Sequence, residues 1–117
     1  MKNDLLETFG QIVKTSRDSG VVVLTDFQEK APKNPSKEQE PLLKLLSSLN
    51  SEDCELLKKS IKYCIDLSLF KLINTLEYGV SDYSFELRMK KSDKSITLID
   101  NEEVDHDLTG EFWNWVE

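Results

Sequence analysis

The stretch LINTLEYGVSDYSFELRMKKSDKSITLI, residues 72–99, decides the fold class, because the spacing of its apolar side chains changes after Gly79. Before this glycine the apolar residues recur every three or four positions, which is typical of a helix. Beyond it, every second residue from 83 to 89 is apolar, which is the period of a half-buried strand. The polar run at 91–94 predicts a turn, with a return strand after it. We therefore predict a β-hairpin at about 83–99.

The segment before this hairpin has the strongest helical pattern in the chain. Its apolar stripe consists of Leu56, Leu57, Ile61, Cys64, Ile65, Leu69, Leu72, Ile73 and Leu76. Residues 66–68 could divide the segment into two helices, and Gly79 is expected to end it. Because an isolated hairpin is marginally stable in water, its apolar face must pack on helices. The predicted fold class is therefore α+β, with helices packed on a small antiparallel sheet.

Two further helices are expected upstream. The first begins near Asn3 or Asp4, either of which can cap its free N–H groups, and ends at the polar run 16–20. The second begins at Pro41, because proline suits the first turn of a helix. Asn50 is expected to break the chain and to start the main helix that follows.

Two segments near these helices have other patterns. Residues 21–25 are largely β-branched and predict a possible extra strand, although so short an apolar run also fits a buried helix. Residues 28–41 contain all three prolines, and Ala31 is their one other apolar residue. They predict a solvated loop, which either serves a function or simply connects two helices.

The length and composition bound the class of protein. With 117 residues the chain fits a single domain, residues 1–117, with one ordinary core. No apolar run approaches the ~18–20 residues that cross a bilayer, and the N-terminal sequence lacks the apolar segment of a secretory signal. Cys54 and Cys64 are about 15 Å apart on one predicted helix, too far for a disulfide. We therefore expect a cytoplasmic protein with no membrane partner.

The charge of the chain is concentrated at one end. The formal net charge is −7, from 15 Lys and Arg against 22 Asp and Glu. All 15 basic residues precede residue 100, whereas residues 100–117 contain seven acids and no Lys or Arg. Nucleic acid is not expected as a partner, because phosphates need a basic patch. A basic protein suits this segment better.

The residues of known catalytic and metal-binding motifs do not occur at the required spacing. The single histidine, His106, lies among acids. A catalytic pair of His106 with Cys54 or Cys64 is formally possible, but both cysteines lie on or near the apolar stripe of the main helix. A calcium loop that starts at Asp100 would need glycine at its sixth position, where Asp105 stands. A looser site for a divalent ion, built from Asp105, His106 and Asp107, stays open, as does an acid–base pair of carboxylates. We expect no enzymatic activity, no metal and no cofactor.

The chain ends in a predicted helix, residues 110–117, capped by Thr109 and rich in aromatic residues. Trp113 and Trp115 are two positions apart, so they project about 200° from each other around a helix. Both could seal the core. Alternatively, one could be buried while the other anchors a partner, since tryptophan is enriched among energetically dominant contacts.

A general resemblance to one class of proteins rests on three features. These are the small size, the acidity, and the carboxylates of residues 100–111 beside Phe112, Trp113 and Trp115. The chain resembles the immunity proteins that bacteria keep against their own polymorphic or contact-dependent toxins. This resemblance implies a non-catalytic inhibitor that neutralises a cationic toxin, such as a nuclease, by covering its active site. The expected partner-binding residues are Asp100, Glu102, Glu103, Asp105, Asp107, Glu111, Trp113 and Trp115. The alternative is a small adaptor or regulatory subunit that acts through homo- or hetero-oligomerisation, and the oligomeric state stays open.

Overall fold

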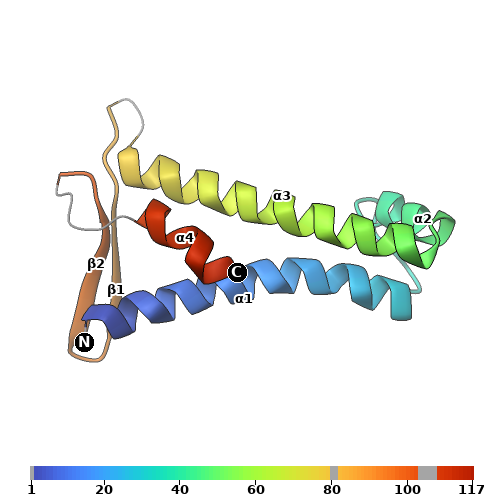
Figure 1. The fold of residues 1–117 in the computed structure, drawn as a ribbon, viewed down its shortest axis with the longest axis horizontal. Coiled ribbons are helices and arrows are strands. Elements are labelled where there is room, and N and C mark those ends of the chain that lie inside the picture. The colour runs from blue at the N-terminus through green and yellow to red at the C-terminus, as the bar shows by residue number, and fades with distance from the viewer. Residues whose placement is uncertain (1, 80–81, 103–107) are drawn as a thin grey trace. The chain divides into compact units, whose positions relative to one another are not determined.

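The computed structural model describes residues 2–79, 82–102 and 108–117 (Figure 1). In chain order the described elements are α1 (Lys2–Glu29), α2 (Glu40–Ser48), α3 (Ser51–Tyr78), β1 (Glu86–Lys91), β2 (Lys94–Asp100) and α4 (Leu108–Val116). Helices predominate, and the two strands form one antiparallel sheet. The fold class is α+β, which confirms the prediction.

The chain divides into two compact units, and α1 and α3 each contribute to both. The first, called the sheet unit, comprises Met1–Ser16 and Asp66–Glu117. The second, called the helical unit, comprises Arg17–Ile65. The single-domain organisation expected from the length stays a prediction.

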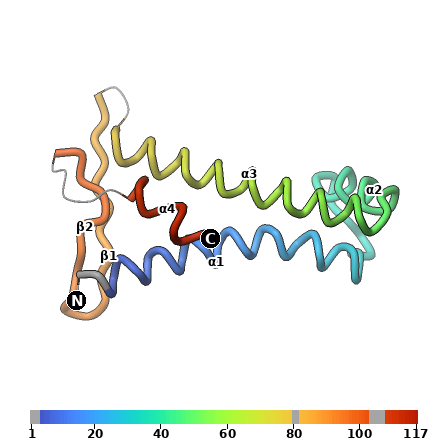
Figure 2. The backbone as a smooth tube through the Cα atoms, in the orientation of Figure 1, coloured from blue at the N-terminus to red at the C-terminus, as the bar shows by residue number. Residues whose placement is uncertain are grey.

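The core of the sheet unit lies between the hairpin and three helical segments (Figure 2). Its buried residues are Leu5, Val13, Ile73, Ile96, Leu98, Ile99, Leu108, Phe112 and Val116. They come from α1, α3, β2 and α4, so α4 is an integral part of this core. The predicted packing of a hairpin on helices is thereby confirmed.

The hairpin contains a β-bulge, in which β2 has one residue more than β1, and this bulge turns an additional side chain into the core. Met89 pairs with Ile96 and Leu87 pairs with Ile99, with an irregularity between Leu87 and Arg88. A bulge breaks the strict alternation of side chains along a strand. Leu98 and Ile99 are consequently both buried although they are neighbours in sequence. The strands fall close to the predicted bounds of 83–99.

The helical unit has a smaller core, formed by Leu24, Leu46 and Cys54. Partly buried apolar residues surround it: Phe27, Leu42, Leu49, Leu57 and Ile61. Pro41 lies in the first turn of α2, as predicted. Asn50 caps α3, because its Oδ1 accepts a hydrogen bond of 2.8 Å from the backbone N–H of Asp53. The polar loop predicted at 28–41 is confirmed over most of its length, between α1 and α2.

Of the two alternatives for residues 21–25, the possible extra strand is wrong and the helix is correct, since α1 continues through this segment to Glu29. Its apolar residues serve a helix, in which Leu24 is buried in the same cluster as Leu46. Gly20 does not end α1 either. A Cβ on Gly20 would lie 3.0 Å from Cδ1 of Ile65, so this glycine allows a close approach of α1 and α3 within the helical unit.

Helix α3 ends where the sequence predicted, but it is not divided in its middle. The suggested break at 66–68 is absent, because α3 is one helix from Ser51 to Tyr78. Gly79 ends it with a φ of +79°, the left-handed conformation that glycine adopts readily. Within the described parts of the chain, every helix is too short or too polar to traverse a bilayer.

Candidate partner-binding surface

The N-terminus of α4 is capped by a side chain from a distant part of the sequence. The carboxylate of Glu77, in the last turn of α3, accepts hydrogen bonds from the backbone N–H groups of Leu108 at 2.6 Å and Thr109 at 3.2 Å. The hydroxyl of Thr109 donates to the same carboxylate at 2.5 Å. A carboxylate at a helix N-terminus satisfies free N–H groups and opposes the positive end of the helix dipole. Glu77, and not Thr109 as predicted, is therefore the cap.

A second side chain joins the end of α3 to the hairpin. The Nδ2 of Asn101 donates to the carbonyl oxygens of Leu76 at 2.9 Å and Glu77 at 2.7 Å. Its Oδ1 accepts from the N–H of Phe85 at 2.5 Å. These bonds satisfy carbonyl groups that every helix leaves free at its C-terminus. Glu77 and Asn101 together fix where β2 ends and where α4 begins.

Trp115 packs against α1 and serves the core. A Cβ on Gly10 would lie only 2.5 Å from Cδ1 of Trp115, so the indole rests directly on the backbone of α1 at this glycine. Phe9 meets the same indole edge-on, with ring centroids 5.6 Å apart and an interplanar angle of 83°. Of the two predicted anchors, Trp115 is therefore the structural one.

Trp113 lies on the other side of α4 and is 38% exposed. Its ring is inclined by 31° to that of Phe70, with centroids 5.4 Å apart. It also meets Phe112 nearly at right angles, with centroids 5.1 Å apart. Because Phe112 is fully buried, the exposed indole is held by a rigid aromatic base. Trp113 is thus the tryptophan that is available to a partner.

The predicted acidic residues are only partly brought together. Glu102 and Glu111 are exposed and Asp100 is half-buried, where its Oδ1 accepts from the N–H of Glu102 at 3.0 Å. Glu103, Asp105 and Asp107 lie outside the described residues. Glu111 and Trp113 project about 200° apart around α4, so they do not form one patch.

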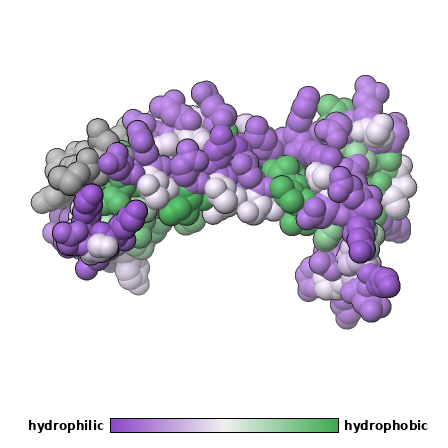
Figure 3. Space-filling view, turned by 90° about the horizontal axis from the view of Figure 1, so that it is seen from below, coloured by the Kyte–Doolittle hydropathy of each residue, from purple (hydrophilic) through white to green (hydrophobic). Residues whose placement is uncertain are grey.

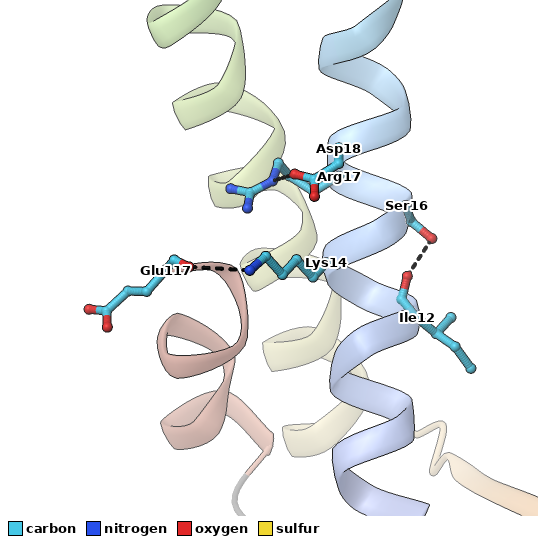
Figure 4. Close-up of polar contacts among 6 residues, drawn as sticks. All are labelled: Ile12, Lys14, Ser16, Arg17, Asp18 and Glu117. Atoms are coloured by element: carbon cyan, nitrogen blue, oxygen red, sulfur yellow. Dashed lines mark hydrogen bonds and ion pairs between the residues drawn. The ribbon is translucent and has the colours of Figure 1, made fainter.

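Glu117 is the acid that follows directly after the end of α4, four positions beyond Trp113, and it is exposed. Its carbonyl oxygen accepts a long hydrogen bond, 3.5 Å, from the Nζ of Lys14 in α1 (Figure 4). A cation at this place stabilises the negative end of the α4 dipole. Lys14 is therefore a structural contact of α4.

The described surface is mainly hydrophilic on the face drawn in Figure 3, where hydrophobic side chains appear as separate patches. In the helical unit, buried Arg17 pairs through its Nε with Oδ1 of exposed Asp18 at 2.6 Å (Figure 4). Such a pair offsets the cost of burying a cation.

Two kinds of chemical site, metal sites and cysteine pairs, can be checked in the described part of the chain. No group of three or more His, Cys, Asp and Glu side chains is placed to hold a metal ion there. Cys54 is buried, Cys64 is exposed and both are free thiols, which confirms that they do not pair with each other. His106 lies outside the described residues, so the predicted alternatives that involve it stay predictions.

Sequence reasoning missed the residues that hold the surface in place. Phe70 was indistinguishable from any other apolar residue of the main helix. Gly10 gave a usable signal, because a glycine inside an apolar helical pattern often has a packing reason. Glu77 and Asn101 gave none, since their bonds reach 16 to 32 residues along the chain.

Comparison with known proteins gives no relative: no protein-family model, no curated protein and no solved structure matches the chain significantly.

Proposed function

We propose that the protein is a non-catalytic protein-binding inhibitor, of the immunity-protein type, that neutralises a cationic toxin such as a nuclease by covering its active site. The observation that carries this proposal is Trp113, a 38% exposed tryptophan with a rigid base, in a terminal segment that contains acids and no Lys or Arg. Exposed tryptophans on rigid supports are frequent anchors of protein interfaces.

The two kinds of residue would contribute differently to binding. Carboxylates act over a distance and accelerate the encounter with a basic partner, and salt screens this effect. Buried aromatic contact slows dissociation. We assign the first role to Asp100, Glu102, Glu103, Asp105, Asp107 and Glu111, and the second to Trp113. Trp115 supports α4 from the opposite side.

The cytoplasm is the proposed site of action. An immunity protein protects the cell that makes it, so it must meet the toxin in the compartment where the toxin would act. The two free thiols agree with a reducing compartment, in which disulfides are rare.

The proposal is tested by capture from a lysate of the native host with the tagged protein, at low and at high salt, with the bound proteins identified by mass spectrometry. We expect one basic protein in equimolar amount, released by salt. Purified partner should then lose its toxic activity on binding. If the tagged protein captured only untagged copies of itself, or no protein at all, the proposal would be contradicted.

A charge-matched pair of variants tests the role of the acidic segment. The triple variant Glu102→Lys, Glu103→Lys and Asp105→Lys should reduce the association rate with the captured partner by about tenfold or more at low salt. The control reverses three exposed acids of the helical unit, Asp26, Glu29 and Glu38, with the same change in net charge. Equal association rates for the two variants would show that the acidic segment has no special role.

A second candidate function is a small adaptor or regulatory subunit that acts through oligomerisation. It is favoured by Leu56 and Tyr63, which are 57% and 60% exposed and lie seven residues apart on α3 of the helical unit. Residues at this spacing share one helix face. Self-association through them would persist at high salt, so light scattering at 1 M salt tests the homo-oligomeric form of this function. A monomer under these conditions would exclude stable self-association.

A further inference from the structure

The indole of Trp113 rests on two aromatic rings. The ring of Phe70 is inclined by 31° to it with centroids 5.4 Å apart, and Phe112 meets it edge-on at 5.1 Å. The indole is nevertheless 38% exposed, and its exposed part is called the open face. An aromatic ring supported in this manner loses little conformational freedom when a partner binds.

The surroundings of this open face favour a cation. The faces of an aromatic ring carry negative electrostatic potential, which is strongest for tryptophan. The exposed Glu117 follows directly after α4, four positions beyond Trp113, and residues 100–117 contain no Lys or Arg. Lys71, the neighbour of Phe70 in α3, projects about 100° away from Phe70 around that helix. Lys14 approaches the carbonyl end of α4 at Glu117.

Of the two basic side chains, arginine fits this place better. Its guanidinium is planar, more weakly hydrated than an ammonium group, and stacks on aromatic faces. It could lie on the open face of Trp113 while its N–H groups remain directed towards the carboxylate of Glu117 or towards water. A lysine would give up more hydration for the same contact.

We propose that the open face of Trp113 receives an arginine side chain of the protein partner by cation–π stacking, with Phe70 as the rigid support behind it and Glu117 as the adjacent carboxylate. This inference rests on the proposed function and names the group that the anchor recognises. It predicts a preference for arginine over lysine at one position of the partner.

The test uses a Trp115→Phe variant, in which Trp113 is the one remaining tryptophan and reports binding by its fluorescence. The probes are two octapeptides of alternating glycine with arginine or with lysine, of equal charge. We expect the arginine peptide to quench Trp113 and to bind about two- to fivefold more tightly than the lysine peptide, which corresponds to a partly exposed cation–π contact. Equal affinities would overturn the assignment.

Two further measurements separate stacking from general attraction by acids. Replacing Trp113 by 5-fluoro- and then 5,7-difluorotryptophan weakens the negative potential of the ring and leaves its shape nearly unchanged. The arginine preference should fall stepwise in this series, whereas a purely apolar or acidic contact would leave it constant and contradict the proposal. Trp113→Leu, with its fold checked by circular dichroism and binding followed by calorimetry, should abolish the preference. A retained preference would equally overturn it.

The outcome is distinguishable from failure of the inhibitor function. If a basic protein is captured in a salt-sensitive manner while both peptides bind alike, the arginine assignment is wrong and the inhibitor function stands. If the peptides show the expected preference while no protein is captured, the cation-binding surface stands and the inhibitor function is wrong.

Discussion

The sheet unit and the helical unit are held together by different means. In the sheet unit the buried residues come from two helices, a strand and α4, and side-chain caps from Glu77 and Asn101 join segments that are distant in sequence. In the helical unit the described core is smaller, and its helix caps are local, as with Asn50 and Asp53. The exposed Trp113 is therefore carried by the part with more long-range constraints. A rigid support of this kind is what an interface anchor needs.

The strongest way to break this comparison is to remove one core side chain from each unit. Phe112→Ala should lower the free energy of unfolding by about 3–5 kcal/mol, because a fully buried aromatic ring leaves a cavity. Leu46→Ala, at a position that is 9% exposed, should cost about 2 kcal/mol, since a rim position can relax. Urea denaturation measures both. Equal losses would show that the two cores are equally constrained.

The two helical glycines sharpen the comparison further. Gly10→Ala should destabilise the protein by about 1–3 kcal/mol, because the new Cβ would lie 2.5 Å from the indole of Trp115. Gly20→Ala serves as the control, since its Cβ would meet only the terminal methyl of Ile65, at 3.0 Å, and that methyl can rotate away. It should be neutral or stabilising by up to about 1 kcal/mol, from helix propensity. Thermal unfolding of both variants distinguishes these outcomes. If Gly10→Ala stabilised the protein, the close contact between Trp115 and the backbone of α1 would be disproved.

A third comparison concerns the two kinds of helix cap. Glu77→Ala removes the acceptor of two backbone N–H groups and one hydroxyl, so we expect a loss of about 2 kcal/mol. Asn50→Ala removes one local acceptor and should cost about 1 kcal/mol. Amide hydrogen exchange gives the location: protection should fall in α4 for the first variant and at the start of α3 for the second. Unchanged exchange in α4 would show that Glu77 is not its cap.

The smallest expected change in stability is at the exposed tryptophan. Trp113→Ala should cost only about 1 kcal/mol, because the side chain is already 38% exposed and chiefly loses its contact with Phe70. Trp115→Ala should cost about 3 kcal/mol, because it removes the indole that packs against Gly10 and leaves a cavity there. Chemical denaturation of the two variants, side by side, checks this order. The reverse order would exchange the roles of the two residues.

The structural features that could be predicted from the sequence are those that depend on residues close together in the chain. The hairpin followed from alternation after Gly79, and the cap at Asn50 followed from its residue type. Residues 21–25 fit a short strand or a buried helix by composition alone, and the burial of Leu24 against Leu46 in the helical unit decides for the helix. Gly20 was taken for a helix end because its close neighbour, Ile65, is 45 residues away.

The candidate surface was predictable in its composition and not in its geometry. The acidic segment and the two tryptophans were visible in the sequence, as was the 200° angle between the tryptophans. Which of them faces solvent depends on Gly10 and Phe70, and no local pattern links these residues to α4. The separation of Glu111 from Trp113 did follow from helix periodicity, but clustering in sequence was taken as clustering in space.

The most direct test of the central claim is capture of the basic partner by the protein and by its Trp113→Ala variant, in parallel and at low salt, with Asn114→Ala as the control. Asn114 is exposed and adjacent on α4, so its loss should leave capture unchanged. We predict that Trp113→Ala reduces the affinity by about 30-fold or more, as for a dominant interface residue. Equal capture by all three proteins would contradict the assignment of this surface as the site of inhibition.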